Sequence, residues 1–486
     1  MPVKTKAKAE FGDFQTPPDL ADAVCRKVLG LIGAPTTILE PTCGVGNLLR
    51  AAREQLGADV DLIGVDINPA HLDSARAALE AVDGAGALRL LHEDFFHLDW
   101  DALLAEVRAP LLVLGNPPWV TNSEVGLLDG SNLPPKNNDL NLHRLEALTG
   151  RSNFDISEWM GWRLLQSLKG RDATIALLLK SSVARKILAQ AWPAGLPIRE
   201  AAMFRIDARE HFGVAVDACL FVVRTDRPGE RRCPVFADLT ASRPEGILGV
   251  DEDGELVADV DGRARTRGLL GEGRDEWRSG VKHDCARVLE LRGVGSRLLN
   301  GFGDAVDVEP EVLYPLMKGS DVAGGRLGGR RWLIVPQTKA GQDTSHLQRS
   351  APRTWAYLSA HAEALDGRKS SIYRKQARFS IFGVGAYTFA PWKVAISGLH
   401  KAVRFTAVGP VEGKPVVFDD TVYLTPCASE HEARLKARLL NSPMAGEFFS
   451  SIVFWDAKRP ITAKVLRRLD MTRLAEALGE GAAAQA

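Results

Sequence analysis

The sequence lacks the features that would assign it at once to a disulfide-rich or zinc-binding class. Its 486 residues include six cysteines, and none of them forms a Cys-x-x-Cys pair or has the Cys/His spacing of a zinc site. The six are Cys25, Cys43, Cys219, Cys233, Cys285 and Cys427. We therefore expect no disulfide framework and no bound metal, and scattered thiols suit a reducing cytoplasm.

Long hydrophobic runs and an excess of one charge are also missing. Apolar runs such as 176–179 are far shorter than the roughly 20 residues that cross a bilayer, and the basic start at 1–14 lacks the apolar core of a signal peptide. We expect a soluble, cytoplasmic protein with no membrane partner. The 61 Lys and Arg residues balance 61 Asp and Glu residues, so a nucleic-acid partner would require a local basic surface.

What is present is a globular composition, with 45% hydrophobic and 25% charged residues. From 11 to 228, apolar runs alternate with helical segments, which predicts an α/β, Rossmann-like domain with a parallel sheet. We expect strands at 37–40, 62–66, 88–91, 111–114, 173–179 and 219–223, and helices at 46–56 and 70–81. Beyond 228 the alternation is lost. We predict an α+β domain over 229–475, with surface loops at 251–262, a helix at 429–440 and a frayed tail.

A glycine-containing turn follows the first predicted strand. The segment ILEPTCGVGNLL places Glu40 at the strand end and Gly44 and Gly46 before a helix, where backbone N–H groups can approach a ligand. The next strand ends in Asp66, which can accept both hydroxyls of a ribose; the alternative is an N-cap of the next helix. Neither the G-x-G-x-x-G spacing nor a P-loop lysine is present. We infer that the cofactor is S-adenosylmethionine.

Two side chains after the third predicted strand suit the adenine of that cofactor. Asp94 can accept a hydrogen bond from the adenine amino group, and Phe95 can cover the ring. The alternative for Phe95, and for the neighbouring Phe96, is packing in the core.

The fourth predicted strand runs into Asn116-Pro117-Pro118-Trp119. Two prolines hold this loop rigid and leave the Asn116 side-chain oxygen and the Pro117 carbonyl as acceptors. Two acceptors suit a weakly nucleophilic amine on an aromatic ring, because they bind both N–H groups and direct the lone pair at the sulfonium methyl. Trp119 offers a face for stacking a planar base. The alternative is a rigid turn that only closes a strand.

In combination, FQTPP at 14–18, ILEPTCGVGNLL, GVDINP, HEDFF and GNPPW resemble motifs X, I, II, III and IV of the gamma-class, TaqI-like N6-adenine methyltransferases of DNA. The resemblance covers about 11–125, and Trp119 stands where the family more often has Tyr or Phe. The stretch 115–138 is also similar to modification methylases of the HincII/HindII type. The resemblance implies that Thr16 lies near the methionine part of the cofactor, with Glu40 and the glycine turn.

The predicted cofactor residues are Thr16, Glu40, Pro41, Gly44, Gly46, Asp66, Ile67, Asp94, Phe95 and Asn116. The predicted catalytic residues are Asn116, Pro117, Pro118 and Trp119. The segment 211–214 is similar to motif VIII, which implies that Phe212 contacts a flipped base opposite Trp119, with Phe204 as the alternative.

A basic segment at 367–411 carries eight Lys and Arg residues, seven aromatic residues and no acidic residue. Such a segment predicts a cleft that binds a polyanion; the alternative is a solvated face over an aromatic core. The predicted DNA-binding residues are Arg368, Lys369, Arg374, Lys375, Arg378, Lys393 and Lys401. The runs at 314–322, 382–399 and 419–424 resemble target-recognition domains attached to this methylase class.

The resemblance implies a site-specific, adenine-specific DNA methyltransferase that modifies a flipped adenine in double-stranded DNA within a restriction–modification or related defence system. We expect it to act as a monomer. Because only about ten residues precede motif X, we expect any cognate restriction endonuclease to be a separate protein. The alternatives are an N4-cytosine DNA methyltransferase, an RNA or protein-glutamine methyltransferase, and a catalytically silent DNA-binding subunit.

Overall fold

The computed structural model describes residues 15–57, 59–84, 86–120, 155–271, 275–326, 331–374 and 376–480. The chain forms two compact units, Met1–Val260 and Asp261–Ala486. Phe14 of the first predicted motif, most of the stretch 115–138, Lys375 and the end of the tail lie outside the described residues. Within the described part of the chain, no helix is both long enough and apolar enough to cross a membrane.

The first unit is built on a ten-stranded sheet in the order β10-β9-β8-β6-β7-β5-β4-β1-β2-β3. Its strands are β1 (Thr37–Glu40), β2 (Asp61–Asp66), β3 (Leu88–His92), β4 (Leu111–Gly115), β5 (Ala173–Lys180), β6 (Glu200–Asp207), β7 (Asp217–Arg224), β8 (Arg232–Phe236), β9 (Gly246–Val250) and β10 (Leu256–Val257). Strands β5, β4, β1, β2 and β3 pair in parallel, whereas β7 is antiparallel to β5 and β6. The predicted α/β, Rossmann-like fold is confirmed.

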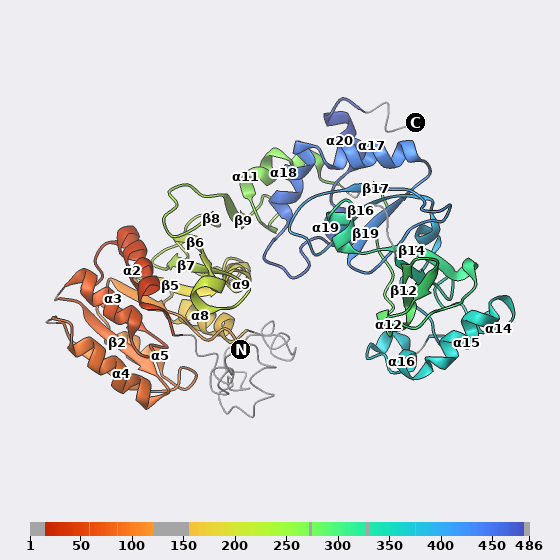
Figure 1. Ribbon diagram of the computed structural model, residues 1–486. Helices are drawn as coiled ribbons and strands as arrows, with labels where there is room; N and C mark the ends of the chain where they lie inside the picture. Colours follow the sequence, from red (N-terminus) through yellow and green to blue (C-terminus); the bar gives the residue numbers. More distant parts are fainter. Residues whose placement is uncertain are drawn as a thin grey trace. The chain divides into compact units, whose positions relative to one another are not determined.

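The central strands lie buried between two groups of helices. Every residue of β1 and β4 is buried, as expected for apolar runs inside a parallel sheet. Figure 1 shows the sheet between α2, α3 and α4 on one side and α5, α8 and α9 on the other. Their bounds are α2 (Pro18–Ile32), α3 (Asn47–Leu56), α4 (Pro69–Glu80), α5 (Trp100–Ala105), α8 (Ile156–Ser167) and α9 (Ser181–Ala191); the short α10 (Ala208–Phe212) follows β6.

The first unit extends beyond the expected boundary at 228. Strand β8 pairs in parallel with β6, β9 pairs with β8, and β10 pairs with β9. The segment 251–262, expected as surface loops, contains β10 and the start of α11 (Val260–Arg265). The strand β6 was also not predicted, because its sequence EAAMFRID has only a weak apolar pattern. These strands are short or mixed in polarity and are stabilised by pairing with their neighbours in the sheet.

The second unit combines two smaller sheets with helices, as the α+β prediction requires. One sheet has the order β11-β19-β16-β17 and the other β13-β12-β15-β14-β18. Their strands are β11 (Arg278–Ser279), β12 (Glu290–Val294), β13 (Arg297–Leu299), β14 (Leu313–Met317), β15 (Arg331–Ile334), β16 (Trp392–Ser397), β17 (Thr406–Val408), β18 (Val417–Phe418) and β19 (Val422–Cys427).

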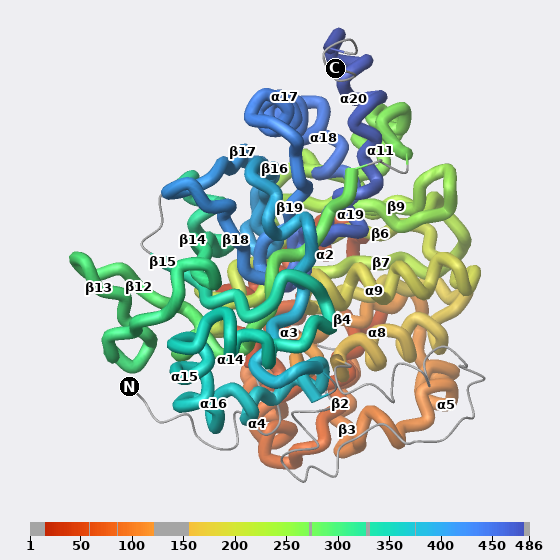
Figure 2. The backbone as a smooth tube through the Cα atoms, turned by 90° about the vertical axis from the view of Figure 1, so that its right-hand side faces the viewer, coloured from red at the N-terminus to blue at the C-terminus, as the bar shows by residue number. Residues whose placement is uncertain are grey.

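Helices cover these sheets, and Figure 2 shows α17 beside β16 and β17, which it contacts. The helices are α12 (Ala286–Leu289), α13 (Gly319–Ala323), α14 (Leu347–Ser350), α15 (Pro352–Ala360), α16 (Ala362–Asp366), α17 (Glu430–Leu440), α18 (Pro443–Ile452), α19 (Ala463–Leu466) and α20 (Met471–Ala477). Short 3-10 turns lie at Arg267–Leu269, Pro310–Val312, Thr344–His346, Ser371–Tyr373 and Ala386–Phe389. The helix predicted at 429–440 is α17, with Ser429 as its N-cap.

Candidate active site

Four predicted site residues come together at one edge of the large sheet. Glu40 and Asp66 are the last residues of β1 and β2, Asn116 directly follows β4, and Asp94 follows β3 after one intervening residue. Because these four strands are parallel neighbours, their carboxyl ends meet at the same edge, where ligands bind in open α/β sheets. The structure therefore brings together residues that are up to 76 positions apart, from Glu40 to Asn116.

The turn after β1 depends on its two glycines. Gly44 and Gly46 have φ angles of 51° and 79°, in the left-handed region that disfavours side chains, and Gly46 is the N-cap of α3. A Cβ atom on Gly46 would also approach Ala75 Cβ to 3.0 Å. Gln15 Oε1 accepts the Val45 N–H at 3.1 Å. The segment before α2 is thereby joined to the glycine turn.

Asp66 connects the turn to the end of β2. Its Oδ2 accepts the Gly44 N–H and its Oδ1 accepts the Asn68 N–H, both at 2.8 Å. The N-cap of α4 is Asn68, whose side chain accepts from Ala70, so the N-cap alternative for Asp66 is wrong. A carboxylate has about four acceptor sites, which leaves capacity for ribose hydroxyls. The neighbouring Ile67 is 45% exposed, an apolar surface beside this carboxylate.

Glu40 is a buried carboxyl group whose charged form would be stabilised by a bound cation. Its side chain is 3% exposed, and Oε2 has no hydrogen-bond partner among the described residues. Burial raises the pKa of Glu40 well above its ordinary value; the Leu49 N–H opposes this rise and the charge of Asp66 adds to it. An ammonium group in contact would offset the desolvation. The residues at this edge therefore fit the amino-acid end of S-adenosylmethionine.

Thr16 links the cofactor edge to the loop after β4. The Asn116 Nδ2 donates to Thr16 Oγ1 at 3.3 Å, and the Asn47 Nδ2 donates to the Thr16 carbonyl at 2.8 Å. Thr16 is buried, so these contacts are shielded from water. With Nδ2 directed at Thr16, the amide of Asn116 has its Oδ1 as the acceptor atom.

The residues after β3 form an aromatic cluster. Asp94 Oδ1 accepts the Phe96 N–H at 2.9 Å and Oδ2 lies 2.9 Å from His97 Nδ1. Phe95 is 5% exposed and packs 4.6 Å from Trp100, which matches the core-packing alternative. Its proposed place over an adenine ring stays a prediction.

One member of this cluster was missed by the sequence analysis. Trp159 of α8 lies 5.2 Å from Phe96 and 6.1 Å from Phe95, measured between ring centroids. It is more than 60 positions away in the sequence and belongs to no motif, so only tertiary structure brings it to this edge.

The two predicted base-contacting aromatic residues touch each other. The Trp119 and Phe212 rings lie 5.1 Å apart at 68°, an edge-to-face pair. Trp119 is 5% exposed, and its indole N–H donates to the Leu178 carbonyl of β5 at 3.1 Å. Phe204, the alternative to Phe212, is buried and stacked on Phe236 at 4.6 Å, so it belongs to the core.

Comparison with known proteins identifies the family. No model of a known protein family matches the sequence. The chain is 42% identical over 476 residues to the type II methyltransferase M.NspV of Nostoc sp., which covers 97% of this chain and 98% of that protein. The chain belongs to the type II methyltransferases.

One further similarity is in sequence and another is in fold. The type II methyltransferase M.TthHB8I of Thermus thermophilus is 31% identical over 159 residues, 32% of this chain and 30% of that protein. The structure of the type IIL restriction-modification enzyme MmeI in complex with DNA has a TM-score of 0.56 at 15% identity, and the similarity covers 95% of this chain and 66% of that one. The similarity to MmeI is one of fold.

In the second unit of this type II methyltransferase, the predicted basic residues separate into exposed and buried groups. Lys369, Arg374, Arg378 and Lys401 are exposed, although Arg378 is paired with Asp366 at 3.0 Å. Lys375 lies outside the described residues.

Two of the seven predicted DNA contacts have structural roles instead. Lys393 is 1% exposed, donates to the Ala390 and Val416 carbonyls, and has a pKa lowered to about 7 by burial. Its assignment to a DNA surface is wrong, because the side chain is buried and its ammonium group is bonded to two backbone carbonyls. Arg368 is half-buried and donates to the carbonyls of Leu365, His283 and Ser380, so its guanidinium stabilises the fold.

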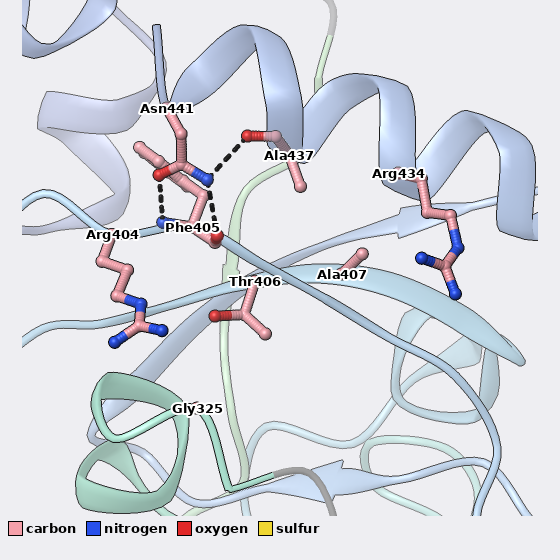
Figure 3. Close-up of a pocket in the computed structure, with 8 residues that line it drawn as sticks. All are labelled: Gly325, Arg404, Phe405, Thr406, Ala407, Arg434, Ala437 and Asn441. Carbon is pink, nitrogen blue, oxygen red and sulfur yellow. Dashed lines mark hydrogen bonds between the residues drawn. The ribbon is translucent and has the colours of Figure 1, made fainter.

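A pocket of about 640 Å³ in the second unit of the methyltransferase is lined in part by a basic residue from outside the segment 367–411. Figure 3 shows Arg404 and Arg434 at its margin, with Thr406 and Ala407 between them. The described residues that line it include no acid, although Arg434 is paired with Glu430 at 2.7 Å. Arg434 lies on α17, and sequence spacing gave no sign that it would approach Arg404.

Proposed function

We propose that this type II methyltransferase is a site-specific DNA methyltransferase that transfers a methyl group from S-adenosylmethionine to the N6 amino group of a flipped adenine in double-stranded DNA. The observation that carries the proposal is that Thr16 joins the Asn116-Pro117 loop to Asn47, the first residue of α3 after the glycine turn, at one edge of the sheet. We propose that it serves as the modification component of a restriction–modification or related defence system, acting as a monomer in the cytoplasm.

The cofactor would be held by residues at the ends of β1, β2 and β3. Glu40 and Thr16 would hold its amino-acid end, Asp66 its ribose, and Ile67 with Asp94 its adenine. When bound, S-adenosylmethionine supplies an electrophilic methyl group on its sulfonium. The glycine turn keeps side chains away from this edge, so that backbone N–H groups can meet a carboxylate.

The target amine would be held by two oxygen acceptors in the rigid loop. Asn116 Oδ1 and the Pro117 carbonyl would accept its two N–H groups, and Thr16 would hold the Asn116 amide in the required orientation. Pro117 and Pro118 limit the loop to few conformations, so the acceptors require little reorganisation. Catalysis by this loop consists of positioning the amine and stabilising the positive charge that develops on it.

The flipped base would enter beside Trp119 and Phe212. Extrusion of a base costs a few kcal/mol, which stacking on aromatic side chains offsets. Because the two rings touch, one of them must move to admit a base. Trp119 is held by its hydrogen bond to Leu178, whereas Phe212 ends the five-residue helix α10, so we expect Phe212 to move.

The DNA backbone would be bound by exposed basic residues of the second unit, among them Lys369, Arg374, Lys401 and the pocket residues Arg404 and Arg434. MmeI, whose fold is similar to that of this chain, has been observed in complex with DNA. This similarity supports the proposal that the chain binds DNA. A cognate endonuclease, if there is one, would act as a separate protein.

Replacing Arg404 and Arg434 together by glutamine is expected to weaken duplex binding and to flatten its salt dependence. The slope of log K against log salt is negative, and each lost phosphate contact reduces its magnitude by about 0.9. Loss of both arginines should therefore reduce the magnitude of the slope by about 2. Fluorescence anisotropy over a salt series measures the slope. Arg76→Gln, exposed on α4, is the control; an unchanged slope in the double variant would place the DNA elsewhere.

Methylation-sensitive long-read sequencing of DNA from cells expressing the protein tests the proposed function directly. We expect N6-methyladenine at one fixed position of one short sequence. N4-methylcytosine would contradict the choice of adenine, since the same acceptor pair binds any ring-conjugated amine. Unmodified DNA from cells that contain folded, cofactor-binding protein would exclude a DNA methyltransferase and leave an RNA or protein substrate or a silent binding subunit.

A further inference from the structure

Lys180, the last residue of β5, contacts the loop that carries Asn116. Its Nζ donates to the Trp119 carbonyl at 3.0 Å and to Asp155 Oδ2 at 2.6 Å. The side chains of Lys180 and Asp155 are 22% and 7% exposed, so water screens this ion pair little. An ammonium group thus holds the carbonyl at the far end of the Asn116–Trp119 tetrapeptide.

Asp155 extends the same network to the helix that follows. Its Oδ1 accepts from the Ser157 N–H at 3.2 Å and from Ser157 Oγ at 2.5 Å, which caps the N-terminus of α8. The next residue, Ile156, donates its N–H to the Val120 carbonyl at 3.0 Å. The Asp155 carboxylate therefore joins the end of β5 to the start of α8, and the Lys180 ammonium and the Ile156 N–H join both to the segment after β4.

This network lies between the two halves of the proposed site. On one side it holds the loop with the Asn116 and Pro117 acceptors. On the other it fixes α8, which carries Trp159 against Phe96 after β3. The loop is held at its near end by the Thr16 hydroxyl and at its far end by Lys180.

We propose that Lys180, together with Asp155, is a positioning residue for methyl transfer: it orients the loop through the Trp119 carbonyl and does not touch the amine. The proposal rests on the proposed function. An error of about 1 Å in the placement of reacting groups can cost about 100-fold in rate. Loss of Lys180 is therefore expected to lower the rate of the chemical step and to leave cofactor affinity unchanged.

A second ion pair, which joins α8 to α9, provides a matched control. Lys186 of α9 binds Glu158 of α8 at 3.0 Å, and Gln190 donates to the same carboxylate at 3.1 Å. Glu158 is as deeply buried as Asp155. Among the described residues, the Glu158 carboxylate binds Lys186 and Gln190 and no group of the loop after β4, so loss of this pair should affect stability and not the loop.

The experiment compares Lys180→Met with Lys186→Met and Lys180→Arg in the full chain. Single-turnover methyl transfer to duplex DNA at saturating S-adenosylmethionine is expected to slow about 100-fold in Lys180→Met. It should be unchanged in Lys186→Met. Lys180→Arg should recover most of the rate, because a guanidinium can donate to the Trp119 and Asp155 oxygens together. Calorimetry measures cofactor affinity, and thermal unfolding measures the stability of each variant.

A second readout is independent of the substrate. Amide hydrogen exchange of peptides that cover 116–120 should accelerate in Lys180→Met and stay as in the wild type in Lys186→Met. If exchange in this segment is unaffected, or if both methionine variants lose rate only in proportion to their folded fraction, the positioning role is overturned. A wild-type protein that methylates no DNA contradicts the proposed function, whereas the exchange data still decide whether Lys180 holds the loop.

Discussion

Asn116→Ala is expected to lower the rate of methyl transfer by about 10²–10³-fold, the usual cost of removing one preorganised polar group that stabilises a transition state. The alanine loses Oδ1, one of two acceptors for the amine, and cannot hold the nitrogen for attack on the methyl group. Affinity for S-adenosylmethionine should change little, because the variant leaves in place the residues proposed to hold the cofactor, which are Thr16, Glu40, Asp66, Ile67 and Asp94. Single-turnover kinetics measure the rate, and calorimetry measures cofactor binding.

Thr16→Val separates the acceptor from its orientation when it is assayed at saturating S-adenosylmethionine, because Thr16 is also proposed to hold the amino-acid end of the cofactor. It removes the hydroxyl that accepts from Asn116 Nδ2 and leaves Oδ1 in place, so we expect a smaller loss of rate than in Asn116→Ala. A duplex with 2-aminopurine at the target position should still report base flipping in Asn116→Ala. If that variant keeps the wild-type turnover, the loop does not hold the amine in the proposed way.

Glu40→Gln is expected to reduce affinity for S-adenosylmethionine by about 2–5 kcal/mol, the cost of removing one partner of a buried charge pair. The substitution keeps the shape of the side chain and removes the charge that would pair with the ammonium group of the cofactor. In the cofactor-free protein the same change should raise the free energy of unfolding at neutral pH. There it removes an ionisable group whose charged form is disfavoured by burial.

The raised pKa of Glu40 makes cofactor binding depend on pH in a defined direction. The ammonium group requires the carboxylate, so affinity should fall as the pH falls through the raised pKa, and binding near or below that pH should release a proton. The free energy of unfolding has the opposite trend: the stability that the protonated carboxyl contributes is full below pH 4.5 and is lost as the pH rises through the folded-state pKa.

Calorimetry in buffers of different ionisation enthalpy counts the protons released on binding. The wild type should release them, and Glu40→Gln should abolish this release. Equal affinities of the two proteins, with no proton released by either, would show that Glu40 does not bind the cofactor.

The large sheet was predictable from local pattern where strands are continuous apolar runs. The strands β1 to β5 and β7 were expected within a residue or two of their ends, because each contains a short run rich in apolar residues that is bounded by polar or turn residues. The strands β6, β8, β9 and β10 were not, since they are short or mixed in polarity and depend on pairing with a neighbour. The boundary expected at 228 was misplaced for the same reason, and the first unit ends at Val260.

The basic segment at 367–411 shows that a count of charged residues does not predict which side chains are exposed. Its charge alone predicts one DNA-binding face, yet Lys393 is buried in β16 and Arg368 binds backbone carbonyls. Net charge along a segment says nothing about which side chains a sheet buries. Arg434, by contrast, joins Arg404 at the pocket only because α17 packs on β17.

Sequence motifs alone indicated a DNA methyltransferase and located Glu40, Asp66 and Asn116, because each of these residues ends or directly follows a recognisable strand and parallel strands bring such positions to one edge. Only the tertiary structure decided that Glu40 is desolvated, that Trp159 reaches Phe96, and that Lys180 holds the Trp119 carbonyl. Burial and contacts between distant segments arise from packing, and no local pattern in the chain encodes them.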